Sequence, residues 1–289
     1  GLGTSIVTPM SQALVGEYID VDDRPRAFSY MLMCFTLVSA FVSGPILNQL
    51  ALWGGWRLSF IGYVLPGAVI GLLFAFLGIP QSKYETTTTK RDPPILESIK
   101  EILMNRSAVA CIICVALGTA SFTCVGVFGV SGFVERFGMP AEWRAPMWSW
   151  LTFMGSLGSY LSGRLVPRIG RRPVSIIGVT VVGVCAVTFN NINAFWVAMA
   201  FVTLCGIGWT VWYPASTSLT LEQTPHLRGS LMSLNNASVS LGQTLGIALG
   251  GYTLLNYGYG ELGWILGAMG ITASIIYQFF THDPTLAHM

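Results

Sequence analysis

Residues 108–133 read AVACIICVALGTASFTCVGVFGVSGF and contain no Asp, Glu, Lys or Arg. A helix that crosses the hydrocarbon core of a membrane needs about 20 mostly apolar residues, so this stretch predicts a transmembrane helix. Charged residues make up only 10% of the chain, whereas soluble domains carry about 25%. Most of the surface must therefore face an apolar medium, and the sequence predicts an all-α integral membrane protein.

Further apolar stretches lie on both sides of this one. The first begins at Gly1 and is short for a complete span, so we interpret it as a span cut at its start. The connections are short except for the one at 80–107. Together the stretches predict nine spans, at about 1–18, 27–52, 58–79, 108–133, 146–165, 173–189, 195–221, 231–255 and 263–280.

Basic residues are distributed unevenly between the two sets of connections. Only Arg57, Arg136 and Arg144 fall on one side, and the other twelve of the 15 Lys and Arg residues fall on the opposite side. Connections rich in Lys and Arg remain in the cytoplasm. The distribution predicts a multi-pass protein of a plasma membrane, which we expect to be prokaryotic, with a cytoplasmic C-terminus.

Two segments about 205 residues apart resemble each other. Residues 1–17 and 206–222 both begin with Gly-x-Gly, and Pro9 and Glu17 correspond to Pro214 and Glu222. Parallel repeats of six spans build one large class of transporters. We therefore expect a two-fold pseudo-repeat of six-helix halves, with three helices preceding Gly1. Residues 1–79 would be the last three helices of the first half, 80–107 a cytoplasmic linker, and 108–289 a complete second half.

The long connection contains one amphipathic segment. In a helix over Ile95–Met104, the apolar residues share a face: Ile95, Leu96, Ile99, Ile102 and Leu103. Such a helix is expected to lie at the cytoplasmic surface of the membrane. The alternative is a solvated linker.

The segment at 163–172, GRLVPRIGRR, resembles the loop signature of the major facilitator superfamily, with Pro167 in place of the family's Asp. The resemblance implies that these arginines pair with acids at neighbouring helix ends and form a conformational latch. The alternative is that they only determine topology. The residues of this expected latch are Gly163, Arg164, Arg168, Gly170, Arg171, Arg172, Glu17, Glu222, Arg24 and Arg228.

A second resemblance lies in the second span, where Gly44-Pro45 is similar to the antiporter signature of the same superfamily. Trp56-Arg57 is likewise similar to its drug and metabolite exporters. Pro interrupts the helix hydrogen bonds, and small residues at a spacing of four allow close helix contacts. We expect a helix-packing motif formed by Gly44, Pro45, Gly242, Gly246 and Gly250.

The resemblance further implies a central cavity between the halves. Polar and aromatic residues at mid-depth of the cavity-lining helices are the candidates for substrate contact, and packing or a membrane-interface position is the alternative for each. No charged residue lies near the middle of any span, so we expect a proton-coupling acid, if one exists, in helices that precede Gly1. The candidates are Gln12, Phe122, Thr123, Trp148, Trp209, Trp212, Tyr213, Asn235, Asn236 and Gln243.

Several functional classes are excluded by the sequence. The histidines lie in a loop and in the tail, and no nucleophile motif or metal-ligand spacing is present, so we predict no enzyme, metal or cofactor. The net charge of +2 is spread over the loops, which gives no nucleic-acid surface.

We predict a monomeric secondary active transporter in a lipid bilayer. Its expected activity is proton-coupled efflux of drug-like or amphiphilic small molecules by alternating access. The alternatives are an importer, exchanger or facilitator of a sugar, amino acid or organic acid, and a membrane sensor that does not transport.

Overall fold

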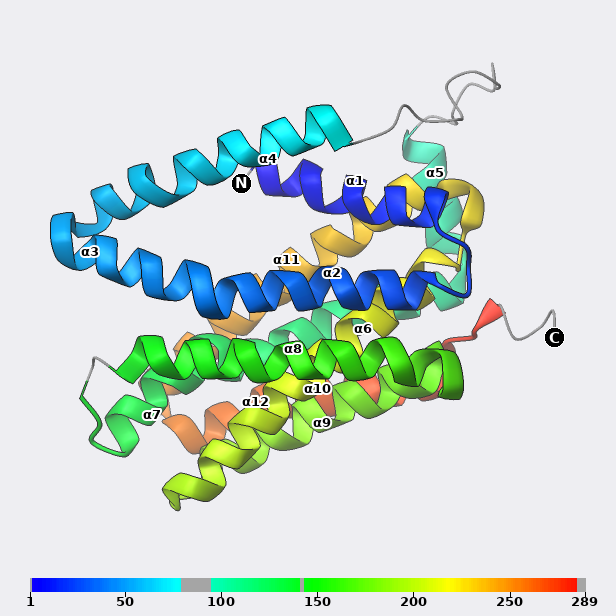
Figure 1. The fold of residues 1–289 in the computed structure, drawn as a ribbon. Coiled ribbons are helices and arrows are strands. Elements are labelled where there is room, and N and C mark those ends of the chain that lie inside the picture. Colours follow the sequence, from blue (N-terminus) through cyan, green and yellow to red (C-terminus); the bar gives the residue numbers. More distant parts are fainter. Residues whose placement is uncertain (1, 79–94, 141–142, 285–289) are drawn as a thin grey trace.

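The computed structural model describes residues 2–78, 95–140 and 143–284, and this part of the chain is a bundle of helices without β-strands (Figure 1). Three π-helical segments, at Ser39–Ser43, Phe60–Val64 and Cys124–Gly129, connect consecutive α-helices. The α-helices are α1 (Leu2–Tyr18), α2 (Arg24–Val38), α3 (Gly44–Ser59), α4 (Leu65–Gly78), α5 (Ile95–Met104), α6 (Arg106–Thr123), α7 (Val130–Arg136), α8 (Arg144–Ile169), α9 (Arg171–Asn191), α10 (Phe195–Leu221), α11 (Arg228–Asn256) and α12 (Tyr259–Phe280).

Several of these helices join into longer rods. The first π-helical segment continues α2 into α3, the second continues the end of α3 into α4, and the third continues α6 into α7. The chain reverses inside α3 at Gly54 and Gly55, where Gly55 has a φ of 71°, a left-handed conformation that favours glycine. The described residues thus form nine rods besides α5, and each of the nine predicted spans falls on one rod.

Within the described residues, six helical segments are long and apolar enough to cross a membrane. The rods of α1, α8 and α11 are not among them, because α1 is short and the other two carry more polar residues. The six segments are Arg24–Val42, Leu52–Phe74, Arg106–Arg136, Arg171–Asn191, Phe195–Leu221 and Tyr259–Phe280.

The segment at 163–172 differs from the expected loop. The helix α8 continues to Ile169 and α9 begins at Arg171, so only Gly170, with a φ of 100°, makes the turn. Gly163, Arg164 and Arg168 therefore lie on the last turns of α8, at positions set by the helix. Glycine allows this one-residue reversal because its left-handed backbone costs little.

The rods form two groups of different density. Helices α6–α12 pack around each other, and α9 contacts both α10 and α12 along its length. In contrast, the segment Leu52–Phe74 of the α1–α4 group buries only 6% of its residues. The two groups meet mainly where α2 packs on α8 and where α1 packs on α11 (Figure 1).

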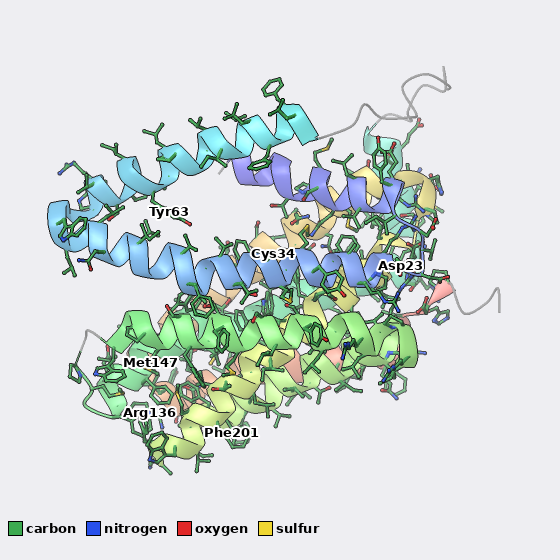
Figure 2. The ribbon with its side chains drawn as sticks, viewed as in Figure 1. Asp23, Cys34, Tyr63, Arg136, Met147 and Phe201 are labelled. Carbon is green, nitrogen blue, oxygen red and sulfur yellow. The ribbon has the colours of Figure 1, made fainter. Side chains whose placement is uncertain are left out.

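The two ends of the bundle differ in chemistry. The α1–α2 turn, α5, the α8–α9 turn and the α10–α11 turn lie at the end near the C-terminus, and we call this the basic end (Figure 1). At the other end lie Arg136 and Met147, whereas Asp23 marks the basic end (Figure 2). We call the end with Met147 the opposite end.

Candidate functional site

An ion pair connects the two helix groups at the basic end. The Nη1 atom of Arg24, at the start of α2, lies 2.5 Å from Oε1 of Glu222, which follows α10. Both side chains are 6% exposed. Because a buried charge is stable only when it is paired and hydrogen-bonded, neither group can leave this contact without a new partner or water.

The remaining donors of Arg24 cap the end of α1. Its Nη2 donates to the carbonyl of Gly16 at 2.6 Å, and its Nε donates to the carbonyl of Ile19 at 2.9 Å. Arg228, at the start of α11, also donates to the Gly16 carbonyl, at 3.0 Å. Helix C-termini leave carbonyls without intrahelical partners and attract cations, so arginines of both groups converge there.

The arginines of the predicted latch do not all bridge the two helix groups. Arg171 donates from Nη2 to the carbonyl of Val21 at 2.6 Å and is also attracted by Glu222. In contrast, Arg172 donates to the carbonyls of Tyr277 and Gln278 within the second group, and Arg164 lies over the ring of Tyr160.

Other members of the expected latch lie nearby. Arg168 and Glu17 are exposed at the basic end. Gly163 faces α2, where an added Cβ atom would lie 3.2 Å from Cβ of Ser29. The structure thus places Arg24, Glu222, Arg171, Arg228 and Gly163 at the contact between the groups.

An apolar cluster lies beside the ion pair. Ile102 of α5 is fully buried and shares this cluster with Phe28 of α2 and Leu221 of α10. The amphipathic helix thus inserts the apolar side chain of Ile102 where both groups meet, whereas the neighbouring Leu103 is 56% exposed. Sequence periodicity placed both on one apolar face, but only tertiary packing distinguishes them. The structure of residues 80–94 lies outside the described residues.

Half-buried aromatic rings form a strip on the second group. Phe122 of α6 stacks on Trp209 of α10 with ring centroids 4.3 Å apart, and Trp209 stacks on Tyr213 at 5.5 Å. Tyr213 lies beside the side chain of Gln12 from α1. Residues 122, 209 and 213 form what we call the aromatic strip, which reaches the contact between the groups.

An amide bridge continues the strip across this contact. Asn236 of α11 donates from Nδ2 to Oε1 of Gln12 at 2.8 Å and also to the carbonyl of Met232 at 2.9 Å. Gln12 is 1% exposed, and its side chain also interacts with that of Tyr213. These contacts place the amides of α1 and α11 beside the aromatic strip at the contact between the groups.

Five other cavity candidates are not part of the strip, although Trp212 packs directly against it, with its ring centroid 5.1 Å from that of Trp209 and 6.4 Å from that of Tyr213. Trp212, Thr123 and Asn235 are buried inside the second group, where Trp212 packs on Gly118 and Gly178. Trp212 follows Trp209 by three positions and adjoins it on α10, but α6 and α9 cover its side chain completely. Trp148 and Gln243 are exposed on α8 and α11.

The surroundings of three of the five residues of the expected packing motif are described. An added Cβ at Gly242 would overlap the carbonyl oxygen of Ala116, and Gly246 faces Ala120 in the same way, so α11 lies directly on α6. Gly250 faces the ring of Phe128. Gly44 and Pro45 begin α3, and what packs against them lies outside the described part of the structure.

Sequence analysis missed Phe28, Ser29 and Ile102 as contact residues between the groups. Periodicity did place Ile102 on an apolar face, but nothing in the sequence pairs it with Phe28. Among the described residues, no cluster of His, Cys, Asp and Glu could hold a metal ion.

Long apolar helical segments packed in two groups define a polytopic membrane protein. The model of the Major Facilitator Superfamily matches residues 1–158 and again 143–288. The chain therefore belongs to the Major Facilitator Superfamily. The two overlapping matches agree with the predicted two-fold repeat.

Individual relatives and solved structures are also similar. The multidrug resistance protein MdtH of Edwardsiella ictaluri is 29% identical over 39% of this chain and 28% of its own length. A probable sugar efflux transporter of Helicobacter pylori is 24% identical over 82% of this chain and 58% of its own length. The chain thus spans less than two thirds of these relatives.

The fold also resembles a known structure. The crystal structure of a bacterial homologue of the iron transporter ferroportin, in an outward-facing state, superposes with a TM-score of 0.70 at 14% identity. The match covers 96% of this chain and 69% of the other. At this identity the likeness shows the fold alone.

Proposed function

We propose that the protein is a secondary active transporter that exports uncharged or amphiphilic small molecules by alternating access. The observation that carries this proposal is the aromatic strip with its amide bridge at the contact between the helix groups. Stacked rings bind the flat apolar face of a ligand, and the amides bind its polar atoms. None of Phe122, Trp209, Tyr213, Gln12 and Asn236 is charged, which favours a neutral or weakly polar substrate over an organic anion.

Alternating access requires contacts that form at one end and break when that end opens. The Arg24–Glu222 pair, the caps on Gly16 and the cluster around Ile102 hold the basic end together. We assign the basic end to the cytoplasm, because basic connections remain there. In this assignment the described conformation is closed toward the cytoplasm, and loading of substrate requires the ion pair to open.

The proposed energy source is the proton gradient. The multidrug resistance protein and the probable sugar efflux transporter similar to this chain are named for resistance and efflux, which supports outward transport. Moving a compound outward against its gradient needs a coupled ion, and an inward proton gradient is the common source in plasma membranes of prokaryotes.

A liposome assay tests the proposal. The full-length protein is reconstituted with a trapped pH dye under an imposed proton gradient, and lipophilic cations, neutral amphiphiles, sugars, and amino and organic acids are added in turn. We expect the gradient to dissipate faster with the amphiphiles, and more slowly in a Trp209→Ala variant. A response to none of the classes would contradict proton-coupled transport and favour a facilitator or a sensor.

A second candidate function is export of a hydroxyl-bearing metabolite such as a sugar. The amides of Gln12 and Asn236 favour it, since amides bind hydroxyl groups as both donors and acceptors. The probable sugar efflux transporter of H. pylori, similar over 82% of this chain, supports the same candidate. In the liposome assay this candidate predicts a response to sugars that is lost in Gln12→Ala and absent for lipophilic cations.

A further inference from the structure

An apolar pocket lies at the opposite end of the bundle, far from the ion pair. It has a volume of about 470 Å³, within the range of known ligand sites. The first turns of α8 and α10 and the segment after α7 form its walls. The described side chains that line it are Met139, Trp143, Pro146, Met147, Trp150, Phe195, Trp196 and Met199.

The chemistry of the lining offers a ligand almost no hydrogen bonds. Among the described lining side chains only tryptophan carries hydrogen-bond donors, and the Nε1 of Trp150 already donates to Oγ1 of Thr203 at 3.1 Å. Methionine adapts its shape to a flexible apolar chain, which suits an occupant without a fixed conformation. The occupant must therefore be hydrocarbon over most of its surface.

The pocket is continuous with the surface that faces the membrane hydrocarbon. On α8, Leu157 and Leu161 follow Trp150 on the same face and are 46% and 44% exposed. On α10, Leu204 follows Trp196 and is 43% exposed. In a membrane-spanning protein these side chains are covered by lipid, so lipid chains lie directly beside the opening of the pocket.

Two tryptophans indicate how deep in the membrane the pocket lies. Trp143 and Trp196 are 51% and 80% exposed at its rim, and tryptophan is enriched where the hydrocarbon meets the headgroups. Met147, at its base, is 7% exposed and belongs to the same buried cluster as Phe133 and Phe189. A chain that enters at the rim thus ends against the core of the second group.

We propose that this pocket binds one acyl chain of a membrane lipid and holds it longer than the lipids around the rest of the bundle. The bound chain fills the space between the first turns of α8 and α10, and it restrains their separation when the opposite end closes. The proposal does not depend on the identity of the transported substrate.

Photocrosslinking in liposomes tests this site. The full-length protein is reconstituted with phosphatidylethanolamine that carries a diazirine near the end of one acyl chain, irradiated, and digested for mass spectrometry. We expect several-fold more label on 143–150 and 195–199 than around Trp264 of α12. Trp264 is 61% exposed on α12, near the end that follows α11, and does not line the pocket, so it reports ordinary lipid contact.

A filling variant makes the test specific. Met199→Phe occupies part of the pocket with an apolar ring, and we expect label at 143–150 to fall to the level found at Trp264. Unchanged label at Trp264 and an unchanged melting temperature show that the variant is folded. Equal labelling of both regions in the unaltered protein would overturn the proposal. Displacement of the pocket label by a transported compound, but not by added unlabelled lipid, would also overturn it in favour of a substrate site.

Discussion

Arg24 and Glu222 lie 198 positions apart, one at the start of α2 and the other after α10, yet their charged atoms are 2.5 Å apart and shielded from solvent. The pair spans the contact between the helix groups, and the donors of Arg24 that remain cap α1. Each charge depends on the other, because removing one partner of a buried pair costs about 3–5 kcal/mol.

The first prediction concerns this ion pair. Glu222→Gln should weaken closure of the basic end, because the guanidinium of Arg24 then lacks a charged partner. Spin labels at exposed positions 26 and 168 report the separation of the groups by pulsed electron resonance, and we expect a longer, broader distance distribution in the variant.

The charge-reversed double variant Arg24→Glu with Glu222→Arg is the control. It should recover part of the short-distance population, because it restores an ion pair in the same place. Identical distributions for the unaltered protein and Glu222→Gln would show that other contacts close this end.

The second prediction concerns the docking of α5. Ile102→Ala should lower the free energy of unfolding by about 2–5 kcal/mol, because it leaves a cavity in a fully buried cluster. The matched control is Leu103→Ala, one residue further and 56% exposed, for which we expect a change within about 0.5 kcal/mol. Thermal unfolding in detergent measures both, and equal effects would mean that α5 is not docked through Ile102.

The third prediction concerns the contact between α11 and α6. Gly242→Ala should destabilise the protein by about 1–3 kcal/mol, because its Cβ would overlap the carbonyl of Ala116 and force the helices apart. Gly251→Ala, on the same helix, has nothing within 4 Å of its added Cβ and should be neutral or slightly stabilising. Melting temperatures that shift equally for both variants would contradict close packing at Gly242.

The fourth prediction concerns substrate contact. Trp209→Ala should weaken binding of a ring-bearing substrate about tenfold, since one aromatic stacking contact contributes about 0.5–1.5 kcal/mol beyond its buried area. Trp148→Ala, exposed on α8 away from the aromatic strip, should leave affinity unchanged. Scintillation proximity binding with the compound identified in the liposome assay measures both, and the opposite order of effects would move the site toward Trp148.

Part of the site could be predicted from the sequence, and part could not. Phe122, Trp209, Tyr213, Gln12 and Asn236 were all candidates by residue type and span, and the structure brings them together. Trp212 satisfied the same criteria and contacts Trp209, but its side chain is fully buried where α6 and α9 pack on α10. The sequence of a single helix does not reveal which of its side chains a neighbouring helix covers.

The sequence by itself determined that this chain is a multi-span helical membrane protein and where its rods lie, and it predicted the amphipathic helix α5 with a solvated linker as the alternative. Those features follow from hydropathy and periodicity, which are local and require no knowledge of neighbours. Only the tertiary structure decided that Arg24 pairs with Glu222, that Gly170 alone turns the chain between α8 and α9, and that Ile102 rather than Leu103 is buried. These are contacts between segments distant in sequence, and packing geometry sets them.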